Sequence, residues 1–257
     1  MLVFSDAQLS QWLADLLYPF MRIAAVFTAA PVFSLRQFPL RARVLLALLI
    51  TWLLQPLIPA APVFETFGPQ AFLVAMQQVA IGLSIGFLLQ MVFQALIFGG
   101  QVIAFSMGLG FAFMMDPQNG IQVPVVSQFW LILAMIAFLM SNSHLLLIGV
   151  LVDSFTILPV AVDGLTREGL WGMLSWAGIV FSAGVAMSLP ILVSLLIVNV
   201  GLGFVARAAP QLNIFAVGFP MTLAMGLVLM WLTLPQVMTR FGELIQETFG
   251  QLGLILG

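Results

Sequence analysis

Cysteine and lysine are absent from this sequence of 257 residues, and histidine and tyrosine occur once each. The lack of cysteine excludes disulfide bonds, thiolate metal sites and cysteine nucleophiles. Charge of either sign is scarce, because charged residues make up 6% of the chain, against about 25% in soluble domains. Seven arginines carry all the side-chain positive charge and the formal net charge is −2, so the sequence does not predict a nucleic-acid-binding surface.

Long apolar stretches fill the rest of the chain, which is 63% hydrophobic with a mean hydropathy of +1.20. Residues 66–115 form the longest uncharged stretch, fifty residues that would measure about 75 Å as one helix. The hydrocarbon core of a bilayer is only about 30 Å thick, so this stretch must fold back or pack against protein. Because no strand-like alternation of barrel length occurs, we predict an all-α integral membrane-type protein of long kinked helices and helical hairpins.

The arginines do not give a consistent membrane topology. Arg36, Arg41 and Arg43 form the only basic cluster. If this cluster is cytoplasmic, Arg207 and Arg240 cannot both be cytoplasmic, because a single apolar stretch separates them. Either one segment is a re-entrant hairpin or the chain does not follow the rules of ordinary membrane-spanning proteins, and we favour the second interpretation.

Three glutamines lie on one side of the apolar stretch before residue 106. At about 100° per residue, Gln90, Gln94 and Gln101 fall within roughly 40° of one another on a helix. Small residues recur every four positions on much the same side: Gly100, Ala104, Gly108 and Ala112. Ordinary helix packing explains this pattern. A face turned toward neighbouring subunits or a water-filled lumen is the alternative.

Asp15, Arg22 and Asp153 interrupt apolar segments, where a charged side chain at mid-membrane costs about 2.5–3.5 kcal/mol on insertion scales. Asp15 and Arg22 share a helix face but lie about two turns apart, near 10 Å, which is too far for direct pairing. Either these side chains extend to the membrane interface, or each meets a partner on another segment or another chain.

One motif indicates possible catalysis. The run "GLSIG", residues 82–86, matches the G-x-S-x-G nucleophile elbow, and Ser84, Asp116 and His144 follow in the chain order of an α/β-hydrolase triad. The elbow needs a strand–turn–helix, whereas this run lies inside a long apolar segment and is also a GxxxG helix-packing motif. We interpret it as packing and expect no catalytic residue, with an intramembrane serine hydrolase as the remote alternative.

His144 ends the polar run "SNSH", which we interpret as a break between two half-helices rather than as a metal site. Broken helices also mark secondary transporters, but no second break occupies a corresponding position in the other half of the chain. A secondary membrane transporter remains an alternative function, although this missing second break counts against it. We expect neither a metal nor a cofactor.

Three stretches resemble, in the same order, the FliR family of flagellar and type III secretion export-gate proteins. They are "FPLRARVLLAL" (residues 38–48), "MGLGFAFMMDPQNG" (107–120) and "RAAPQLNIFAVGFPMTLAMGL" (207–227). The Ala-Pro-Gln-x-Asn-x-Phe run is the most specific of these signals. Length and hydrophobicity match as well, so the resemblance extends over essentially the whole chain. We favour the flagellar members over their injectisome counterparts.

The resemblance implies a non-enzymatic subunit of the flagellar export gate. In that family a FliP-like helical part, here residues 1–168, precedes a FliQ-like helical hairpin with a C-terminal tail, here residues 169–257. The subunit assembles with FliP and FliQ into a helical pore for unfolded flagellar substrates. The gate lies in the bacterial inner membrane within the flagellar basal body and its ring, is raised toward the periplasm, and works with FlhB and FlhA.

The resemblance also implies that residues 106–122 form a plug loop, which blocks the pore until substrate arrives. The composition suits this role, because methionine is an adaptable apolar filler, glycine allows unusual backbone angles, and Asp-Pro and Asn-Gly favour turns. An ordinary interhelical loop is the alternative. The candidate gating residues are Met107, Gly108, Gly110, Phe111, Phe113, Met114, Met115, Asp116, Pro117 and Gly120.

Candidate residues for subunit contacts come from the polar positions within apolar segments and from the two motifs that contain arginine. They are Asp15, Arg22, Arg41, Arg43, Gln90, Gln94, Gln101, Asp153, Arg207, Pro210, Gln211 and Asn213. Arg207, Gln211 and Asn213 are expected at the tip of the C-terminal hairpin, where polar groups meet solvent or a cytoplasmic partner such as FlhB.

Overall fold

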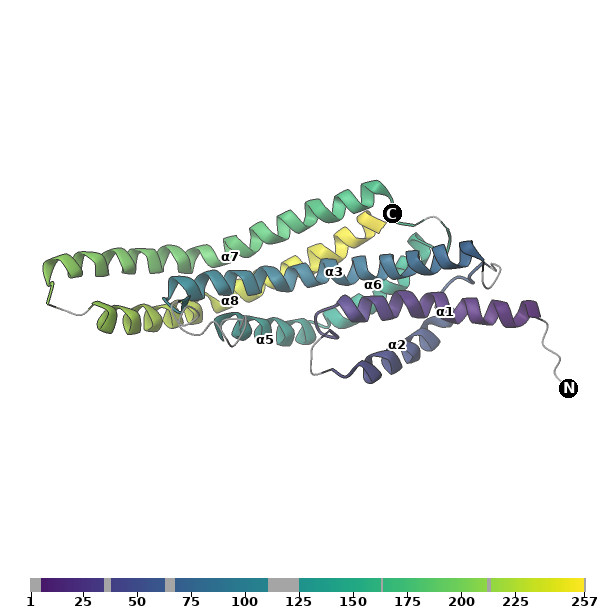
Figure 1. The fold of residues 1–257 in the computed structure, drawn as a ribbon, viewed down its shortest axis with the longest axis horizontal. Coiled ribbons are helices and arrows are strands. Elements are labelled where there is room, and N and C mark those ends of the chain that lie inside the picture. The colour runs from purple at the N-terminus through teal and green to yellow at the C-terminus, as the bar shows by residue number, and fades with distance from the viewer. Residues whose placement is uncertain are drawn as a thin grey trace. The chain divides into compact units, whose positions relative to one another are not determined.

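The computed structural model of the chain describes residues 6–34, 38–62, 68–110, 125–162, 164–211 and 214–256. Within these ranges every regular element is a helix, which confirms the predicted all-α class (Figure 1). In chain order the elements are α1 (Asp6–Ala29), α2 (Leu40–Leu54), the short 3₁₀ helix η1 (Gln55–Leu57), α3 (Pro69–Ser106), α5 (Val125–Met140), α6 (Ser143–Ile157), α7 (Arg167–Ala208) and α8 (Ile214–Leu256).

Local sequence signals explain several of the helix ends. Proline occupies the N-cap of α2 at Pro39 and the first turn of α3 at Pro69, where a missing backbone N–H costs nothing. The predicted break at "SNSH" is confirmed, because α5 ends just before Ser141 and α6 begins at Ser143. Asn142 between them has a φ of +54°, a left-handed conformation that asparagine tolerates better than most residues.

Several helices are long and apolar enough to cross a membrane, as the sequence predicts. Among the described residues these are Gln11–Ala29, Leu40–Leu57, Pro69–Ser106, Arg167–Ala208 and Ala216–Ile255. α5 and α6 together would add one further, broken span. The helices therefore support a membrane protein of the predicted kind.

Segments from distant parts of the sequence form two compact units. Unit 1 contains residues 1–91, 142–178 and 245–257, and unit 2 contains residues 92–141 and 179–244. The long helices α3, α7 and α8 contribute residues to both units. The predicted boundary after residue 168 separates a FliP-like part from a FliQ-like part. It describes similarity to two other proteins and not the division into compact units, and it stays a prediction.

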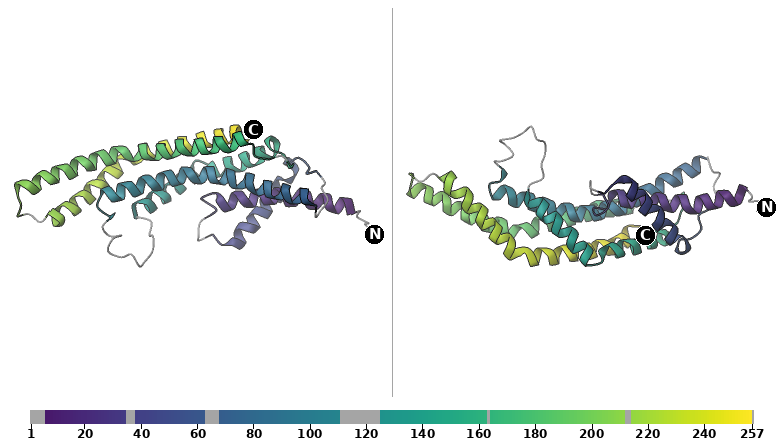
Figure 2. Two further views of the ribbon diagram at one scale, coloured as in Figure 1. Left: turned by 45° about the horizontal axis from the view of Figure 1, so that its top comes forward. Right: turned by 90° about the horizontal axis from the view of Figure 1, so that it is seen from below.

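In unit 1, α1 lies beside α2 (Figures 1 and 2) and packs closely on α3. The contact with α3 occurs at the two glycines of "GLSIG". A Cβ on Gly86 would lie 2.5 Å from Ala29 Cβ and 3.0 Å from Ala30 N, and a Cβ on Gly82 would collide with the Arg22 carbonyl oxygen. The run is therefore a helix-packing motif, and the two backbones approach as closely as its glycines allow.

Arg22 also joins three segments of unit 1, and its side chain is completely buried. Its Nε donates to Gln78 Oε1 at 2.8 Å, Nη1 donates to the Ser154 carbonyl oxygen at 2.7 Å, and Nη2 donates to the Leu158 carbonyl oxygen at 2.8 Å. The guanidinium carbon lies 4.1 Å from the centre of the Phe155 ring. The two carbonyls belong to the C-terminal end of α6, where the helix dipole is negative, and the Ser154 oxygen also accepts the Leu158 N–H at 3.0 Å. Arg22 thus ties α1 to α3 and to the end of α6.

In unit 2, α3 packs against α5 and α7 through small residues. A Cβ on Gly100 would lie 2.9 Å from Trp130 Cδ1 on α5, and a Cβ on Gly184 of α7 would lie 2.6 Å from the Ala95 carbonyl oxygen. Phe93 packs edge-on against Phe138 and Phe241, with ring centres 5.7 and 5.2 Å apart. Gly100, one of the regularly spaced small residues of α3, therefore serves helix packing, whereas Ala112 lies outside the described residues and the interpretation of the whole set stays a prediction.

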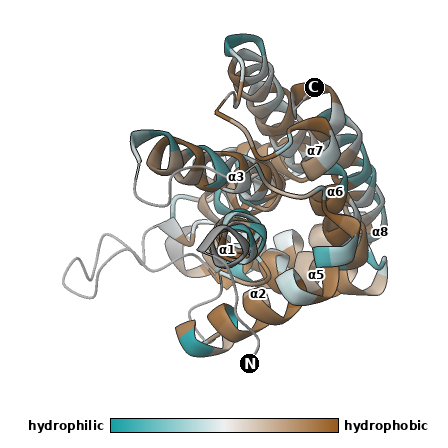
Figure 3. Ribbon diagram, turned by 90° about the vertical axis from the view of Figure 1, so that its right-hand side faces the viewer, coloured by the Kyte–Doolittle hydropathy of each residue, from teal (hydrophilic) through white to brown (hydrophobic). Residues whose placement is uncertain are grey.

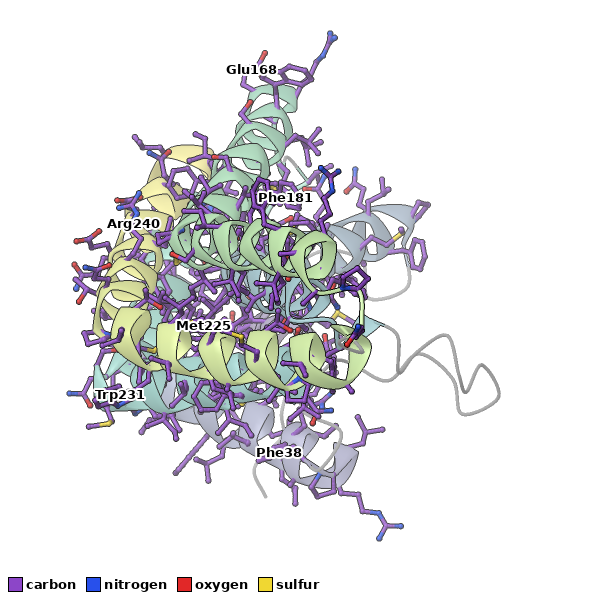
Figure 4. The ribbon with its side chains drawn as sticks, turned by 90° about the vertical axis from the view of Figure 1, so that its left-hand side faces the viewer. Phe38, Glu168, Phe181, Met225, Trp231 and Arg240 are labelled. Atoms are coloured by element: carbon purple, nitrogen blue, oxygen red, sulfur yellow. The ribbon has the colours of Figure 1, made fainter. Side chains whose placement is uncertain are left out.

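Large apolar side chains remain uncovered on several helices. In the most apolar windows of α7 and α8 only 11% and 22% of residues are buried, against 56% in α3. Brown, apolar residues run along most of α2 in Figure 3, and Trp231 projects from α8 in Figure 4 with 73% of its surface exposed. These faces need lipid or other protein chains to cover them.

We expect Gly86→Ala to destabilise the protein, because the added methyl group overpacks the contact between α1 and α3, an effect of about 1–3 kcal/mol. Gly149→Ala is the matched control, since a Cβ there meets no atom within 4 Å. At such an open helical position alanine should be neutral or stabilising by up to about 1 kcal/mol. Thermal loss of the monodisperse size-exclusion peak in detergent measures both. Equal shifts for the two variants would contradict the packing assignment.

Arg22→Met should destabilise the protein by more than about 2 kcal/mol, because it removes the donor to the buried Gln78 Oε1 and to the Leu158 carbonyl oxygen at the end of α6. Arg22→Lys should recover only part of this, since a point-like ammonium cannot reach all three oxygens as the guanidinium fork does. Arg41→Met, at an exposed arginine, should have almost no effect in the same thermal assay. A stable Arg22→Met protein would show that these hydrogen bonds contribute little.

Candidate functional site

The last turn of α3 leads into the predicted plug loop and ends at a glycine. Gly108 has a φ of +84°, a left-handed conformation that costs glycine little. The Gly108 N–H donates to the Phe105 carbonyl at 3.0 Å, and the Leu109 N–H donates to the Ala104 carbonyl at 3.0 Å. These two bonds form a Schellman motif, in which a left-handed residue stops the helix and pairs two of its terminal carbonyls. Gly108 therefore sets where the helix ends and the loop begins.

Met107, just before this glycine, is packed against α8 and is only 1% exposed. A Cβ on Gly226 would lie 2.6 Å from Met107 Cγ, 2.7 Å from its Cε and 2.8 Å from its Sδ, so the methionine side chain lies directly over the backbone of α8. Thr222, one turn earlier on α8, donates its hydroxyl to the Met107 carbonyl oxygen at 3.2 Å. A Cβ on Gly108 would meet the ring of Phe219 at 3.2 Å.

Helix α7 reaches the same turn through Asn199. Its Nδ2 donates to the Ser106 carbonyl oxygen at 3.4 Å. The backbone at the end of α3 is thus contacted by side chains from both helices of the C-terminal hairpin, and all of these residues lie in unit 2.

Of the ten candidate gating residues, the structure describes Met107, Gly108 and Gly110. Gly110 lies close to Phe105, whose ring carbon Cδ1 would be 2.8 Å from an added Cβ. The others, which are Phe111, Phe113, Met114, Met115, Asp116, Pro117 and Gly120, lie outside the described residues. The gating role of all ten stays a prediction.

The two charged candidates of α1 do not pair with each other. Asp15 Oδ1 accepts hydrogen bonds from Gln11 Nε2 at 2.9 Å and from the Ala61 N–H at 2.8 Å, so it fixes the segment after η1. Arg22 bonds to α3 and α6 as described above. Each therefore meets a partner on another segment of the same chain, and a role for either in subunit contacts stays a prediction.

The remaining candidate contact residues are spread over several helices. On α3, Gln94 is exposed while Gln90 and Gln101 are half-buried. On α2, Arg41 is exposed and Arg43 is half-buried, and Asp153 on α6 is exposed. Arg207, Pro210 and Gln211 are exposed around the connection between α7 and α8, whereas Asn213 lies outside the described residues. The hairpin predicted around "RAAPQLN" is present, since α7 ends at Ala208 and α8 begins at Ile214.

The serine-hydrolase alternative does not fit the structure around Ser84. The motif lies in the middle of α3 instead of at a strand–turn–helix, and the Ser84 hydroxyl donates to the Ala80 carbonyl of its own helix at 2.8 Å. Such a back-bonded hydroxyl is common for serine within helices. Asp116, the proposed acid, lies outside the described residues.

Reasoning from the sequence did not single out the residues that hold the end of α3. Phe219, Thr222 and Gly226 follow one another at spacings of three and four, which places them on one face of α8. A glycine in the middle of a long apolar helix was the signal for a close contact. Nothing local in the sequence connects that contact with Met107, more than a hundred residues earlier.

A known family and several known proteins are similar to this chain over most of its length. The model of the family described as bacterial export proteins, family 1, matches residues 13–248. The chain is 36% identical over 258 residues to the flagellar biosynthetic proteins FliR of Pectobacterium carotovorum subsp. carotovorum and of Escherichia coli strain K12, an alignment that covers 100% of this chain and 98% of each relative. It is 31% identical over 214 residues to FliR of Bacillus subtilis strain 168, covering 82% of both. The chain therefore belongs to the FliR family of bacterial export proteins.

Proposed function

We propose that this chain is a subunit of the export gate of the flagellar type III secretion apparatus, which assembles with FliP and FliQ into a helical pore for unfolded flagellar substrates. The observation that carries the proposal is the full-length similarity to FliR proteins, whose names refer to flagellar biosynthesis. Those names and that of the export family point to a transport component rather than to an enzyme.

The uncovered helices support assembly with other subunits. α7 has 42 residues and α8 has 43, so at 1.5 Å per residue each is over about 60 Å long, twice the roughly 30 Å of a hydrocarbon core. Each contains an 18-residue apolar window in which no more than 22% of the residues are buried. FliP and FliQ chains packed around them would cover the apolar surface that lipid cannot reach. A gate raised from the inner membrane toward the periplasm, inside the basal body ring, would accommodate helices of this length.

The C-terminal hairpin supports the proposed likeness to FliQ. It begins with α7 at Arg167, next to the predicted division after residue 168, and consists of two helices joined by a short connection. Its exposed polar residues Arg207 and Gln211 are suited to a partner outside the membrane. We propose FlhB as that partner, with FlhA as a further neighbour in the apparatus.

The loop at residues 106–122 is proposed to plug the gate. A closed gate must retain ions and small solutes yet admit a polypeptide, which requires an apolar, deformable seal. The sequence supplies that seal as interleaved phenylalanine, methionine and glycine, and Gly108 ends the rigid helix just before it.

Deletion of residues 110–120 should leave the gate assembled but leaky, because it removes two aromatic side chains that can each cover on the order of 150–250 Å². Replacing both Phe111 and Phe113 with glycine should act in the same direction. Replacing both with leucine is the matched control, since it keeps apolar bulk and should keep the gate tight. Small-solute uptake by cells that produce the whole gate measures the leak. If the gate with the deletion assembles and shows no increase in small-solute uptake, this stretch is an ordinary interhelical loop.

Arg207→Glu should weaken binding of FlhB while the complex with FliP and FliQ remains intact, because the charge reversal lies at the exposed connection of the hairpin. Arg167→Glu, also exposed but at the start of α7, is the control and should bind FlhB normally. Co-purification of each partner with the tagged chain reports both associations. If Arg207→Glu recovers as much FlhB as the unmodified chain, the connection between α7 and α8 is a simple turn with no role in FlhB binding.

A further inference from the structure

Helix α2 has one side that packs on the protein and another whose side chains are exposed. The packed side consists of Ala47, Ile50, Thr51 and Leu54, which are all buried, and α2 lies against α1. The exposed side contains only large apolar side chains over nearly three turns, which are Val44, Leu45, Leu48, Leu49, Trp52 and Leu53. Trp52 is the most exposed of them, at 72%. A contiguous apolar side of this kind must meet either lipid or another protein.

The apolar span that contains α2 has the length that lipid can cover. Leu40–Leu57 has 18 residues, of which 17% are buried, and it measures about 27 Å at 1.5 Å per residue. Because a hydrocarbon core is about 30 Å thick, acyl chains can cover this span from end to end, which they cannot do for α3, α7 or α8. A helix lying flat on a membrane surface would need a polar side, and between Arg43 and Gln55 the only polar residue is the buried Thr51.

Both ends of this span carry side chains that suit the headgroup layer of a membrane. Arg41 and Arg43 lie in the first turn of α2, where long arginine side chains can reach lipid phosphates while their stems stay in the apolar layer. Trp52 and Gln55 lie near the other end and are exposed. Tryptophan is enriched where hydrocarbon gives way to water. The span is therefore bounded as a lipid-facing helix is expected to be.

The size of the exposed side chains distinguishes lipid from protein as the partner of α2. Close helix contacts in this chain occur at glycines, as at Gly86 between α3 and α1 and at Gly184 between α7 and α3. Helices α7 and α8 contain further glycines where an added Cβ would meet no atom within 4 Å, among them Gly178, Gly201 and Gly242. α2 contains no glycine. Small residues are typical of helix–helix interfaces in membranes, so α7 and α8 suit further protein helices whereas the leucines of α2 suit lipid.

We propose that α2 is a phospholipid-binding span, with acyl chains covering the side that contains Leu45, Leu49 and Leu53 and phosphate headgroups bound by Arg41 and Arg43. This inference goes beyond the export-gate function and does not depend on it. It divides the uncovered apolar surface of the chain between two partners, with lipid at α2 and other subunits at α7 and α8.

The absence of cysteine makes a direct test possible, because one introduced cysteine carries the only label on the chain. Nitroxide labels are attached at Leu45→Cys, Leu49→Cys or Leu53→Cys. Ile197→Cys on α7 is the matched control, since Ile197 is 68% exposed and Leu49 is 60% exposed in the chain by itself. The chain is purified with cysteine-free FliP and FliQ and returned to vesicles of phosphatidylethanolamine and phosphatidylglycerol. Collision rates are measured with oxygen, which dissolves in lipid, and with a water-soluble nickel complex.

We expect all three labels on α2 to collide with oxygen several-fold more often than the label at 197, and rarely with nickel. The ratio of the two rates should be highest at 49, which lies midway between Leu40 and Leu57. Low rates with both reagents would show that protein covers α2, and a high rate with nickel would show that it lies in water. Either result overturns the proposal.

The headgroup contact has a separate measurement. Arg41→Glu combined with Arg43→Glu should lower the amount of phosphatidylglycerol that the purified gate retains several-fold, because the charge reversal repels the anionic phosphate. Arg41→Lys combined with Arg43→Lys keeps the charge and should retain the lipid. If the glutamate variant does not enter the membrane, glutamine at both positions removes the charge without reversing it and decides the question. Unchanged lipid retention without the arginine charges would overturn the assignment of headgroups to these residues.

Failure of this inference and failure of the proposed function give different results. If the chain does not assemble with FliP and FliQ, the export-gate proposal fails, and the same labels in the chain reconstituted alone still test α2. If the label at 197 collides with oxygen as often in the complete gate as in the chain alone, other subunits do not cover this part of α7. The result at 45, 49 and 53 then still decides whether lipid covers α2.

Discussion

The length of apolar helix in this chain is the constraint on which its other features depend. Three helices of 38, 42 and 43 residues correspond to about 57–65 Å, and a bilayer offers a hydrocarbon core of only about 30 Å. Lipid therefore cannot cover these helices from end to end, and the shallow burial of α7 and α8 leaves their apolar faces for other chains. The same constraint favours the interpretation that the chain does not follow the topology rules of ordinary membrane-spanning proteins. The positive-inside rule describes ordinary membrane-spanning helices, whereas these helices are about twice as long as the hydrocarbon core is thick.

Several polar side chains in this environment form hydrogen bonds to the ends of other elements. Arg22 donates to the carbonyls at the end of α6, Asn199 and Thr222 donate to those at the end of α3, and Asp15 accepts from the backbone after η1. The cost of these polar side chains in an apolar setting is offset by their hydrogen bonds to backbone groups. Arg22, Asn199 and Thr222 thus each connect one helix to the end of another.

The features that could be predicted from the sequence are those with local causes. The helices follow from composition, the break at Asn142 from a polar run, and a close helix contact from the spacing of Gly82 and Gly86, although the sequence did not name α1 as the partner. The partners of Arg22 were not predictable, since Gln78 and Ser154 lie 56 and 132 positions away along the chain. Nothing in the local sequence distinguishes Thr222 from a threonine that bonds only within its own helix, because its contact with Met107 depends on how α8 packs on α3. Long-range contacts of this kind depend on how helices pack, which hydropathy does not encode.

The end of α3 shows how distant segments of the chain complete the end of one helix. Gly108 stops α3 in a left-handed conformation, at a position that the local sequence can specify. The carbonyl oxygens of Ser106 and Met107 accept hydrogen bonds from Asn199 on α7 and Thr222 on α8, and the Met107 side chain lies against Gly226. The point at which the chain leaves α3 is therefore fixed by both helices of the C-terminal hairpin, so that a substitution on α7 or α8 can alter a helix end about a hundred residues earlier in the sequence.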